Sequence, residues 1–297
     1  MSGAGRDPLL VTGMPRTATG WVGRMLEASG RLVYVHQPLN PNHPPGRSPG
    51  VLRAEVRHAF QYISEEDERD WLPAFRDTVQ LRYHPLAELR RNHAPDDLWR
   101  AAGQMAGFAL GRLRGRRVVL GDPYAVFAAP WLHRRVGCQV VVTVRDPVAT
   151  VSSWRRLGWR PTLGDLLAQP ALVRERLAPF RGALLAAGAD PADVVGQATL
   201  LWRVIYGTVL AFRKEIRGVV VVRAEDLSVD PAPTFAALYD RLGLPFGPAA
   251  ERAIARTIHA GGRASQEGLR RQEAARVRAL TADVAPAYGY VAEQLSR

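Results

Sequence analysis

Short β-like runs recur along this chain, and each is followed by a stretch with helical periodicity. The runs lie at residues 9–12, 31–36, 117–120, 139–144 and 219–223. Strands that alternate with helical patterns are typical of parallel strands joined by helical crossovers. The pattern therefore predicts an α/β fold of three layers, in which helices flank a central parallel sheet. A chain of 297 residues is long enough for one large α/β domain or two small ones, and we expect one.

Two long segments interrupt the alternation, and we expect both to be helical insertions. The first lies at about 38–116, begins with the proline-rich residues 38–49, and has helical patterns around 51–63 and 97–112. The second lies at about 162–215 and contains the apolar stretch 194–212, which carries Gln197 and Arg203 and is predicted to be a buried helix. The tail from residue 248 is predicted to form helices with a break at residues 261–262. Insertions of this kind commonly build a binding pocket or a lid.

The charge of the chain indicates an anionic partner without naming it. The formal net charge is +12, and basic proteins bind anions, including the phosphates of nucleic acids. The basic residues are almost all arginine, with Lys214 as the one lysine, and they do not form a stripe interleaved with aromatic residues. We therefore expect no specific nucleic-acid partner.

Cysteine usage and the amino terminus indicate a compartment. Cys138 is the one cysteine and lies in an apolar run, so it is expected to be a small core residue and no disulfide forms within the chain. Residues 1–8 are small and polar and have no apolar run of signal-peptide length. We expect a cytoplasmic protein with no membrane span.

Polar or loop-forming segments follow every predicted strand. They are residues 15–21, His36, Asp122, Arg145 and residues 223–226. In an open parallel sheet, ligands lie outside the carboxyl ends of the strands. These five segments are therefore predicted to meet at one edge of the sheet.

The segment after the first strand has the features of a phosphate-binding loop. It is a turn of small and hydroxylated residues that leads into an amphipathic helix, and backbone N–H groups at such a helix start bind anions. Arg16 adds a permanent charge, while Thr17 and Thr19 either donate hydroxyl hydrogen bonds to a ligand or cap the helix. The Walker A and Gly-x-Gly-x-x-Gly patterns are absent, which disfavours a common P-loop kinase and NAD binding.

The segment after the fourth strand has a second anion-binding pattern. Arg145 ends the strand, Pro147 lies near the first turn of a helix, and Ser153 follows about two turns later. An arginine and a serine in these positions can close around one oxyanion. Two other interpretations stay open, because Asp146 could cap the helix and Arg145 could pair with a carboxylate.

The two motifs resemble those of PAPS-dependent sulfotransferases of the bacterial, P-loop-like type. Residues 15–21, Pro-Arg-Thr-Ala-Thr-Gly-Trp, are similar to the family's Pro-(Lys/Arg)-Ser-Gly-Thr-Thr-Trp loop, with Ala18 in place of glycine and Gly20 in place of threonine. Arg145-Asp146-Pro147 and Ser153 are similar to the family's 3′-phosphate motif. Residues 221–227, with Asp230-Pro231 and the Leu-Gly-Leu-Pro of residues 242–245, resemble a third family segment.

The resemblance implies one sulfotransferase-like domain over residues 1–297 that transfers a sulfuryl group from PAPS. It implies that the acceptor is a hydroxyl or amine of a small-molecule or glycan-type compound and that no metal is required. It also implies that Arg16 acts in catalysis and that Trp21 stacks on adenine. The implied PAPS-binding residues are Arg16, Thr17, Ala18, Thr19, Gly20, Trp21, Arg145 and Ser153. A non-catalytic nucleotide- or nucleic-acid-binding protein and a kinase-like phosphotransferase are the alternatives.

The acceptor base has no single assignment from the sequence. Related sulfotransferases have a Glu-Pro-(Leu/Phe)-Asn segment, and this chain has Gln37 in place of the glutamate. Either His36 is the base, or Asp122 is, or the acceptor is reactive enough to need little help.

Overall fold

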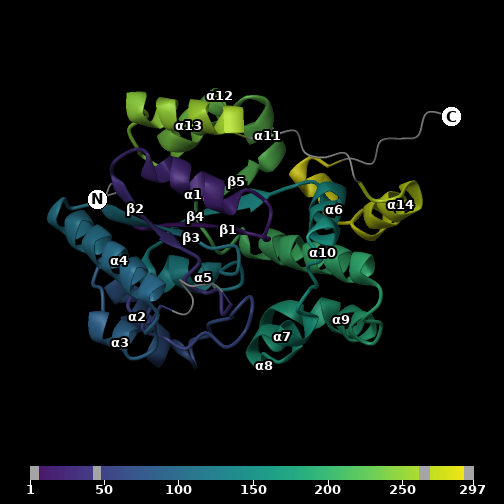
Figure 1. The fold of residues 1–297 in the computed structure, drawn as a ribbon. Coiled ribbons are helices and arrows are strands. Elements are labelled where there is room, and N and C mark those ends of the chain that lie inside the picture. Colours follow the sequence, from purple (N-terminus) through teal and green to yellow (C-terminus); the bar gives the residue numbers. More distant parts are fainter. Residues whose placement is uncertain (1–6, 43–47, 261–267, 291–297) are drawn as a thin grey trace.

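The computed structural model describes residues 7–42, 48–260 and 268–290. Its centre is a five-stranded parallel sheet with the strand order β2-β3-β1-β4-β5 (Figure 1). The strands are β1 (Leu9–Gly13), β2 (Leu32–His36), β3 (Arg117–Gly121), β4 (Gln139–Val144) and β5 (Val220–Arg223). All five predicted strands are present, with each bound within one residue of its predicted position. The predicted α/β fold is therefore confirmed.

The two faces of the sheet carry separate apolar cores. Leu9 and Val11 of β1 pack on one face with α1, α12 and α13, while Leu10 packs on the other face with α5 and α10 (Figure 1). This division follows from the alternation of side chains along a strand. The bounds are α1 (Thr19–Glu27), α5 (Ala129–Trp131), α10 (Val194–Phe212), α12 (Pro231–Arg241) and α13 (Pro248–Ala260).

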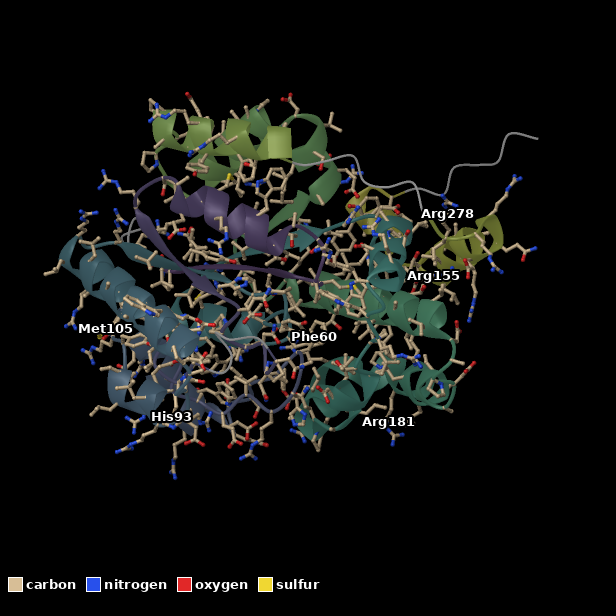
Figure 2. The ribbon with its side chains drawn as sticks, viewed as in Figure 1. Phe60, His93, Met105, Arg155, Arg181 and Arg278 are labelled. Atoms are coloured by element: carbon tan, nitrogen blue, oxygen red, sulfur yellow. The ribbon has the colours of Figure 1, made fainter. Side chains whose placement is uncertain are left out.

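Among its described residues, the first insertion is helical only from Glu68 onward. It contains α2 (Glu68–Val79), α3 (Pro85–Leu89) and α4 (Pro95–Leu113), and α4 contains the helix predicted at 97–112. The helix predicted around 51–63 is wrong, because the chain there is irregular. Its apolar side chains are still buried, and Phe60, labelled in Figure 2, lies in the main core with 1% exposure.

Side chains from the second insertion replace the helical hydrogen bonds that residues 51–63 would have made. Asp165 accepts a hydrogen bond from the backbone N–H of Ala59 at 2.8 Å, and Gln169 accepts one from that of Tyr62 at 2.7 Å. Buried backbone groups need partners of some kind, and here tertiary partners provide them. The apolar spacing alone could not distinguish this arrangement from a helix.

The second insertion consists mainly of helices, of which α10 packs on one face of the sheet. These are α7 (Leu163–Leu167), α8 (Pro170–Leu172), α9 (Arg181–Gly188) and α10, and they follow α6 (Pro147–Arg156). Within the part of the chain that the structure describes, α10 is the one helix that could cross a membrane by length and composition. However, 61% of its most apolar window is buried in the protein, which agrees with the predicted buried helix.

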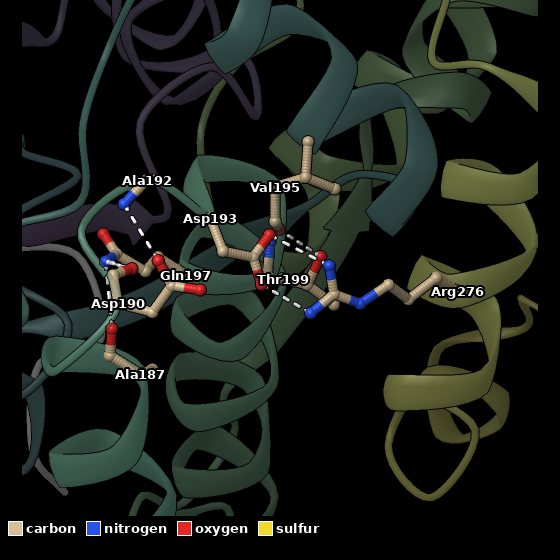
Figure 3. A network of polar contacts seen from close by, with 9 residues as sticks. Ala187, Asp190, Ala192, Asp193, Val195, Gln197, Thr199 and Arg276 are labelled. Carbon is tan, nitrogen blue, oxygen red and sulfur yellow. Dashed lines mark hydrogen bonds and ion pairs between the residues drawn. The ribbon is translucent and has the colours of Figure 1, made fainter.

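The helix α14 (Arg271–Leu280) is tied to α10 and α6 by ion pairs. Arg276 binds both carboxylate oxygens of Asp193, which also accepts a hydrogen bond from Gly196 N–H and so caps α10 (Figure 3). The Arg276 guanidinium lowers the pKa of Asp193. Arg155 of α6 pairs with Glu273. The predicted break at residues 261–262 lies outside the described residues.

Candidate functional site

A cavity of about 990 Å³ lies at the carboxyl edge of the sheet. All five strand ends contribute to it, as predicted from the sequence. The connection after β1 leads to β2 on one side, whereas the connection after β4 leads to β5 on the other, so the cavity lies at a switch point of the sheet. Its lining comprises Pro15, Arg16, Ala18, Thr19, Gly20, Trp21, Gln37, Asn40, Pro123, Tyr124, Arg145, Ala149, Trp159, Ala224, Glu225, Ser228 and Val229.

The loop after β1 has a conformation that favours glycine at two positions without having glycine there. Arg16 has φ 80° and Ala18 has φ 72°, both in the left-handed region. Ala18 is the N-cap of α1 and makes no side-chain cap. The first N–H groups of α1 therefore lack a side-chain partner within the described structure, which suits an anion site.

The hydroxyl groups of Thr17 and Thr19 point into the protein. Thr17 Oγ1 donates to Met14 O at 2.7 Å and lies 2.9 Å from Thr143 Oγ1, and Thr19 Oγ1 lies 2.8 Å from the same atom. Both threonines are buried. These hydroxyl groups therefore fix the loop against β4.

A tyrosine from α10 completes this support. Tyr206 donates from its hydroxyl to Thr143 O at 2.9 Å and accepts from the N–H of Met14 at 3.2 Å. Tyr206 is fully buried, and burial raises the pKa of its phenol well above the usual value. The sequence gives no local signal for this role, because 192 positions separate Tyr206 from Met14.

The two predicted anion motifs meet in the structure. Arg16 donates from Nε to the hydroxyl of Ser153 at 3.3 Å, and Arg145 donates from Nη1 to the carbonyl of Arg16 at 3.4 Å. Trp154 Nε1 donates to Pro15 O at 3.0 Å and joins α6 to the loop. The side chain of Asp146 accepts a hydrogen bond from Ala149 N–H at 2.8 Å, so the cap predicted as an alternative for Asp146 is present.

Charges of both signs surround Arg145. Burial lowers the pKa of the Arg145 guanidinium, the neighbouring Arg16 and Arg156 lower it further, and Glu225 and Asp146 oppose this shift. The carboxylate of Glu225 also accepts hydrogen bonds from Asp146 N–H at 2.9 Å and from the Tyr290 hydroxyl at 2.7 Å. Clustered guanidinium groups repel one another, so an anion between them is stabilised.

The two predicted base candidates lie beside the cavity rather than on its described lining. His36 is held by a hydrogen bond of 2.9 Å between its Nδ1 and the Tyr34 hydroxyl. Asp122 is fully buried and accepts hydrogen bonds from the N–H groups of Leu39 at 2.5 Å and Tyr124 at 2.8 Å. Burial raises the pKa of Asp122 to about 7. Asp122 therefore holds the loop after β2 in position.

Gln37 lies on the cavity lining, where a carboxylate would be expected from the sulfotransferase resemblance. Asn40 donates from Nδ2 to Gln37 Oε1 at 2.7 Å, and this bond orients the Gln37 amide. Gln37 has φ 48°, another left-handed conformation. Tyr124 and Trp159 also line the cavity. Sequence reasoning missed both aromatic residues, because neither belongs to a quoted motif.

The comparison with protein families decides the assignment. The model of a sulfotransferase family, described as "Sulfotransferase family", matches residues 8–248. The chain belongs to the sulfotransferase family. No curated protein matches it.

Solved structures similar to this sulfotransferase include bacterial enzymes. The sulfotransferase STF9 of Mycobacterium avium shares 14% identity with a TM-score of 0.52, over 97% of this chain and 78% of that one. The sulfotransferase domain of the Synechococcus olefin synthase also shares 14% identity, with a TM-score of 0.44 over 97% of both chains. At this identity, the M. avium structure supports the fold alone. The family assignment rests on the match over residues 8–248.

Proposed function

We propose that this sulfotransferase moves a sulfuryl group from PAPS to a hydroxyl group of a small molecule. The observation that carries the proposal is the meeting of Arg16, Arg145 and Ser153 at one switch point of the sheet. Arg16 lies in the loop after β1, Arg145 lies just before α6, and Ser153 lies within α6. An adenine nucleotide with phosphates on both its 3′ and 5′ positions has charges that such a divided site can hold.

The residues present fit PAPS as a substrate. Arg145 and Ser153 are proposed to hold the 3′-phosphate, because a guanidinium and a hydroxyl make the charge-assisted hydrogen bonds that phosphates require. The uncapped start of α1 is proposed to hold the 5′-phosphate through backbone N–H groups. Gly20 has no hydroxyl group, and those of Thr17 and Thr19 are directed to Thr143. Backbone N–H groups and Arg16 are therefore proposed to bind the 5′-phosphate end of PAPS.

Trp21 is proposed to contact the adenine base. Its ring lines the cavity and packs edge-on against Phe235, with the ring centroids 5.5 Å apart. Its buried Nε1 atom has no hydrogen-bond partner within the described residues. A flat aromatic surface held by a second ring suits base stacking, which is worth about 1–3 kcal/mol per base in nucleic-acid complexes.

Arg16 is proposed to stabilise the transition state. PAPS supplies the sulfuryl group, and negative charge develops on the oxygen that bridges sulfur and the 5′-phosphate as the transfer proceeds. A cation fixed near that oxygen lowers the barrier because it need not reorganise during the reaction. The hydrogen bond to Ser153 and the left-handed backbone hold Arg16 in place.

The lining of the cavity supports an acceptor that needs little help from a base. Glu225 is the one carboxylate among its described residues, and it already binds Asp146 and Tyr290. A phenol ionises near pH 10, whereas an aliphatic hydroxyl resembles water, whose pKa is about 15.7. Tyr124 and Trp159 offer aromatic surfaces to such a ring. We therefore propose a phenolic acceptor and assign Gln37 to orient its hydroxyl group.

Product analysis by mass spectrometry tests this function. The protein is incubated with PAPS and, in parallel, with a panel of phenols, aliphatic alcohols, amines and sugars. The proposal predicts sulfated phenols together with adenosine 3′,5′-bisphosphate, and loss of both products with Arg16→Ala. Sulfated sugars or amines alone would refute the acceptor class. Phosphorylated products with ATP, or no product with any acceptor, would refute the proposed function.

A further inference from the structure

The helix α4 has an apolar surface on the side that faces away from the protein. Its inner side already packs on the sheet, where Phe108 is 4% exposed and a Cβ atom at Gly111 would lie 2.4 Å from Val33. On the outer side, Trp99 is 80% exposed and Leu113 is 85% exposed. A soluble helix normally buries its large apolar side chains and exposes polar ones. Within the part of the chain that the structure describes, the outer side of α4 has no partner that covers these apolar residues.

The polar side chains in the first half of α4 do not cover this outer side. Arg100 pairs with Glu88 at 3.2 Å and with Asp97 at 3.0 Å, and Gln104 accepts a hydrogen bond from Ser48 at 3.1 Å. These residues thus serve the contact of α4 with its own chain. Met105, labelled in Figure 2 at the margin of the molecule, lies on the flank of α4 three residues before the buried Phe108 and is 44% exposed.

The outer side has the spacing of a helix-pairing seam. Trp99, Gly103, Ala106, Leu110 and Leu113 follow one another at steps of four, three, four and three residues, which is the a/d repeat of paired helices. All five are exposed. The seam has large residues at its ends and small ones in the middle. Small residues allow two helix backbones to approach closely.

We propose that α4 pairs with α4 of a second copy of this chain, antiparallel and about a two-fold axis beside Ala106. This register brings Trp99 of one copy opposite Leu113 of its mate. It also brings Leu110 opposite Gly103, so that a large side chain meets a gap. A two-fold contact of this kind is self-complementary and closes at a dimer.

Charged residues at the two ends of α4 favour an antiparallel pair with a second copy of the chain. Asp96 lies in the first turn of α4 and Arg114 is its C-cap residue. Among the described residues, neither has an ion pair within its own chain. In the antiparallel pair each Asp96 lies near Arg114 of the other copy. A parallel pair would bring like charges together at both ends, which is unfavourable.

Sedimentation velocity at micromolar protein concentration tests the proposal. We expect wild-type protein to be a dimer and both Trp99→Glu and Ala106→Arg to be monomers with unchanged circular dichroism. Leu185→Glu is the matched control, because Leu185 is 48% exposed on α9 and should leave the dimer intact. A monomeric wild type would overturn the proposal, as would a dimer that survives both seam variants.

Charge reversal and cross-linking test the orientation. Asp96→Arg should weaken the dimer, and the double change Asp96→Arg with Arg114→Asp should restore it. Ala106→Cys should form an intermolecular disulfide on mild oxidation, since the two copies of this position meet at the axis, while Leu185→Cys should not. Cys138 is fully buried and does not interfere. Failure of the double change to restore the dimer, or equal cross-linking of both cysteine variants, would refute the antiparallel pairing.

Discussion

Arg16 and Ser153 are 137 positions apart in the chain, yet the Nε of Arg16 donates a hydrogen bond to the Ser153 hydroxyl over 3.3 Å. The contact joins the loop that follows β1 to the helix that follows β4. Because those two strands are neighbours in the sheet, both predicted anion motifs lie on the same side of one crevice. Changes that loosen either loop should therefore affect both ends of the proposed nucleotide ligand.

Removal of the Tyr206 hydroxyl should loosen the loop without touching the ligand. In Tyr206→Phe, the buried N–H of Met14 and carbonyl of Thr143 lose their shared partner. An unsatisfied buried group costs about 1–3 kcal/mol, so the free energy of unfolding should fall by about that amount in a urea titration. Affinity for adenosine 3′,5′-bisphosphate should fall as well. Unchanged stability would show that the hydroxyl has no structural role.

The left-handed conformation of Ala18 should make glycine the better residue there. A non-glycine residue in that region costs about 1–2 kcal/mol of stability. Glycine in turn lowers stability by about 0.4–1 kcal/mol, because it gives the unfolded chain more conformational entropy. Ala18→Gly should therefore raise the free energy of unfolding by up to about 1.6 kcal/mol. The control Ala28→Gly, at φ −62°, should lower it. A loss of stability in both variants would contradict the strain assigned to Ala18.

Asp122 should give the protein a pH-dependent stability. Its folded-state pKa is raised to about 7 by burial, while the unfolded value is near 3.9. The native state therefore binds the proton more tightly than the unfolded state. The resulting contribution to the free energy of unfolding is fully present below about pH 4 and is lost as the pH rises through about 7. Urea titrations should show wild type losing stability relative to Asp122→Asn between about pH 5 and pH 8. A wild type that keeps or gains stability relative to Asp122→Asn over that range would contradict the assignment.

The strands and the positions of the two proposed anion motifs at the strand ends were predictable from the sequence because they depend on local patterns. Apolar runs such as residues 139–144 are bounded by polar residues, and Pro147 marks the first turn of a helix. The roles of Thr17, Thr143 and Tyr206 were not predictable, since they depend on hydrogen bonds between distant segments. The irregular chain at 51–63 was mistaken for a helix for the same reason.

A carboxylate at position 37 should broaden the range of acceptors. Gln37→Glu puts a base on the cavity lining, and a positioned base contributes about 10²–10⁴-fold. We expect turnover of aliphatic alcohols to rise by about that factor and to depend on the ionisation of the new carboxylate, while turnover of phenols changes less. Steady-state rates on both acceptor classes across pH measure this. No gain with alcohols would contradict the proposed place of Gln37 beside the acceptor.

His36→Ala tests whether His36 is the base or whether the acceptor needs little help from a base. Because His36 lies outside the described cavity lining and binds Tyr34, we expect kcat on a phenol to fall by less than about tenfold. A fall of about 10²–10⁴-fold would instead identify His36 as the base.

Calorimetry with adenosine 3′,5′-bisphosphate and ADP tests the central claim most directly, because it needs no knowledge of the acceptor. The bisphosphate carries the 3′-phosphate that Arg145 and Ser153 are proposed to hold, whereas ADP lacks it and carries both of its phosphates at the 5′ position. We predict tighter binding of the bisphosphate, and Arg145→Ala should remove about 1.5–3 kcal/mol of that binding while leaving ADP nearly unchanged. Equal affinity of the wild-type protein for the two ligands would contradict the account.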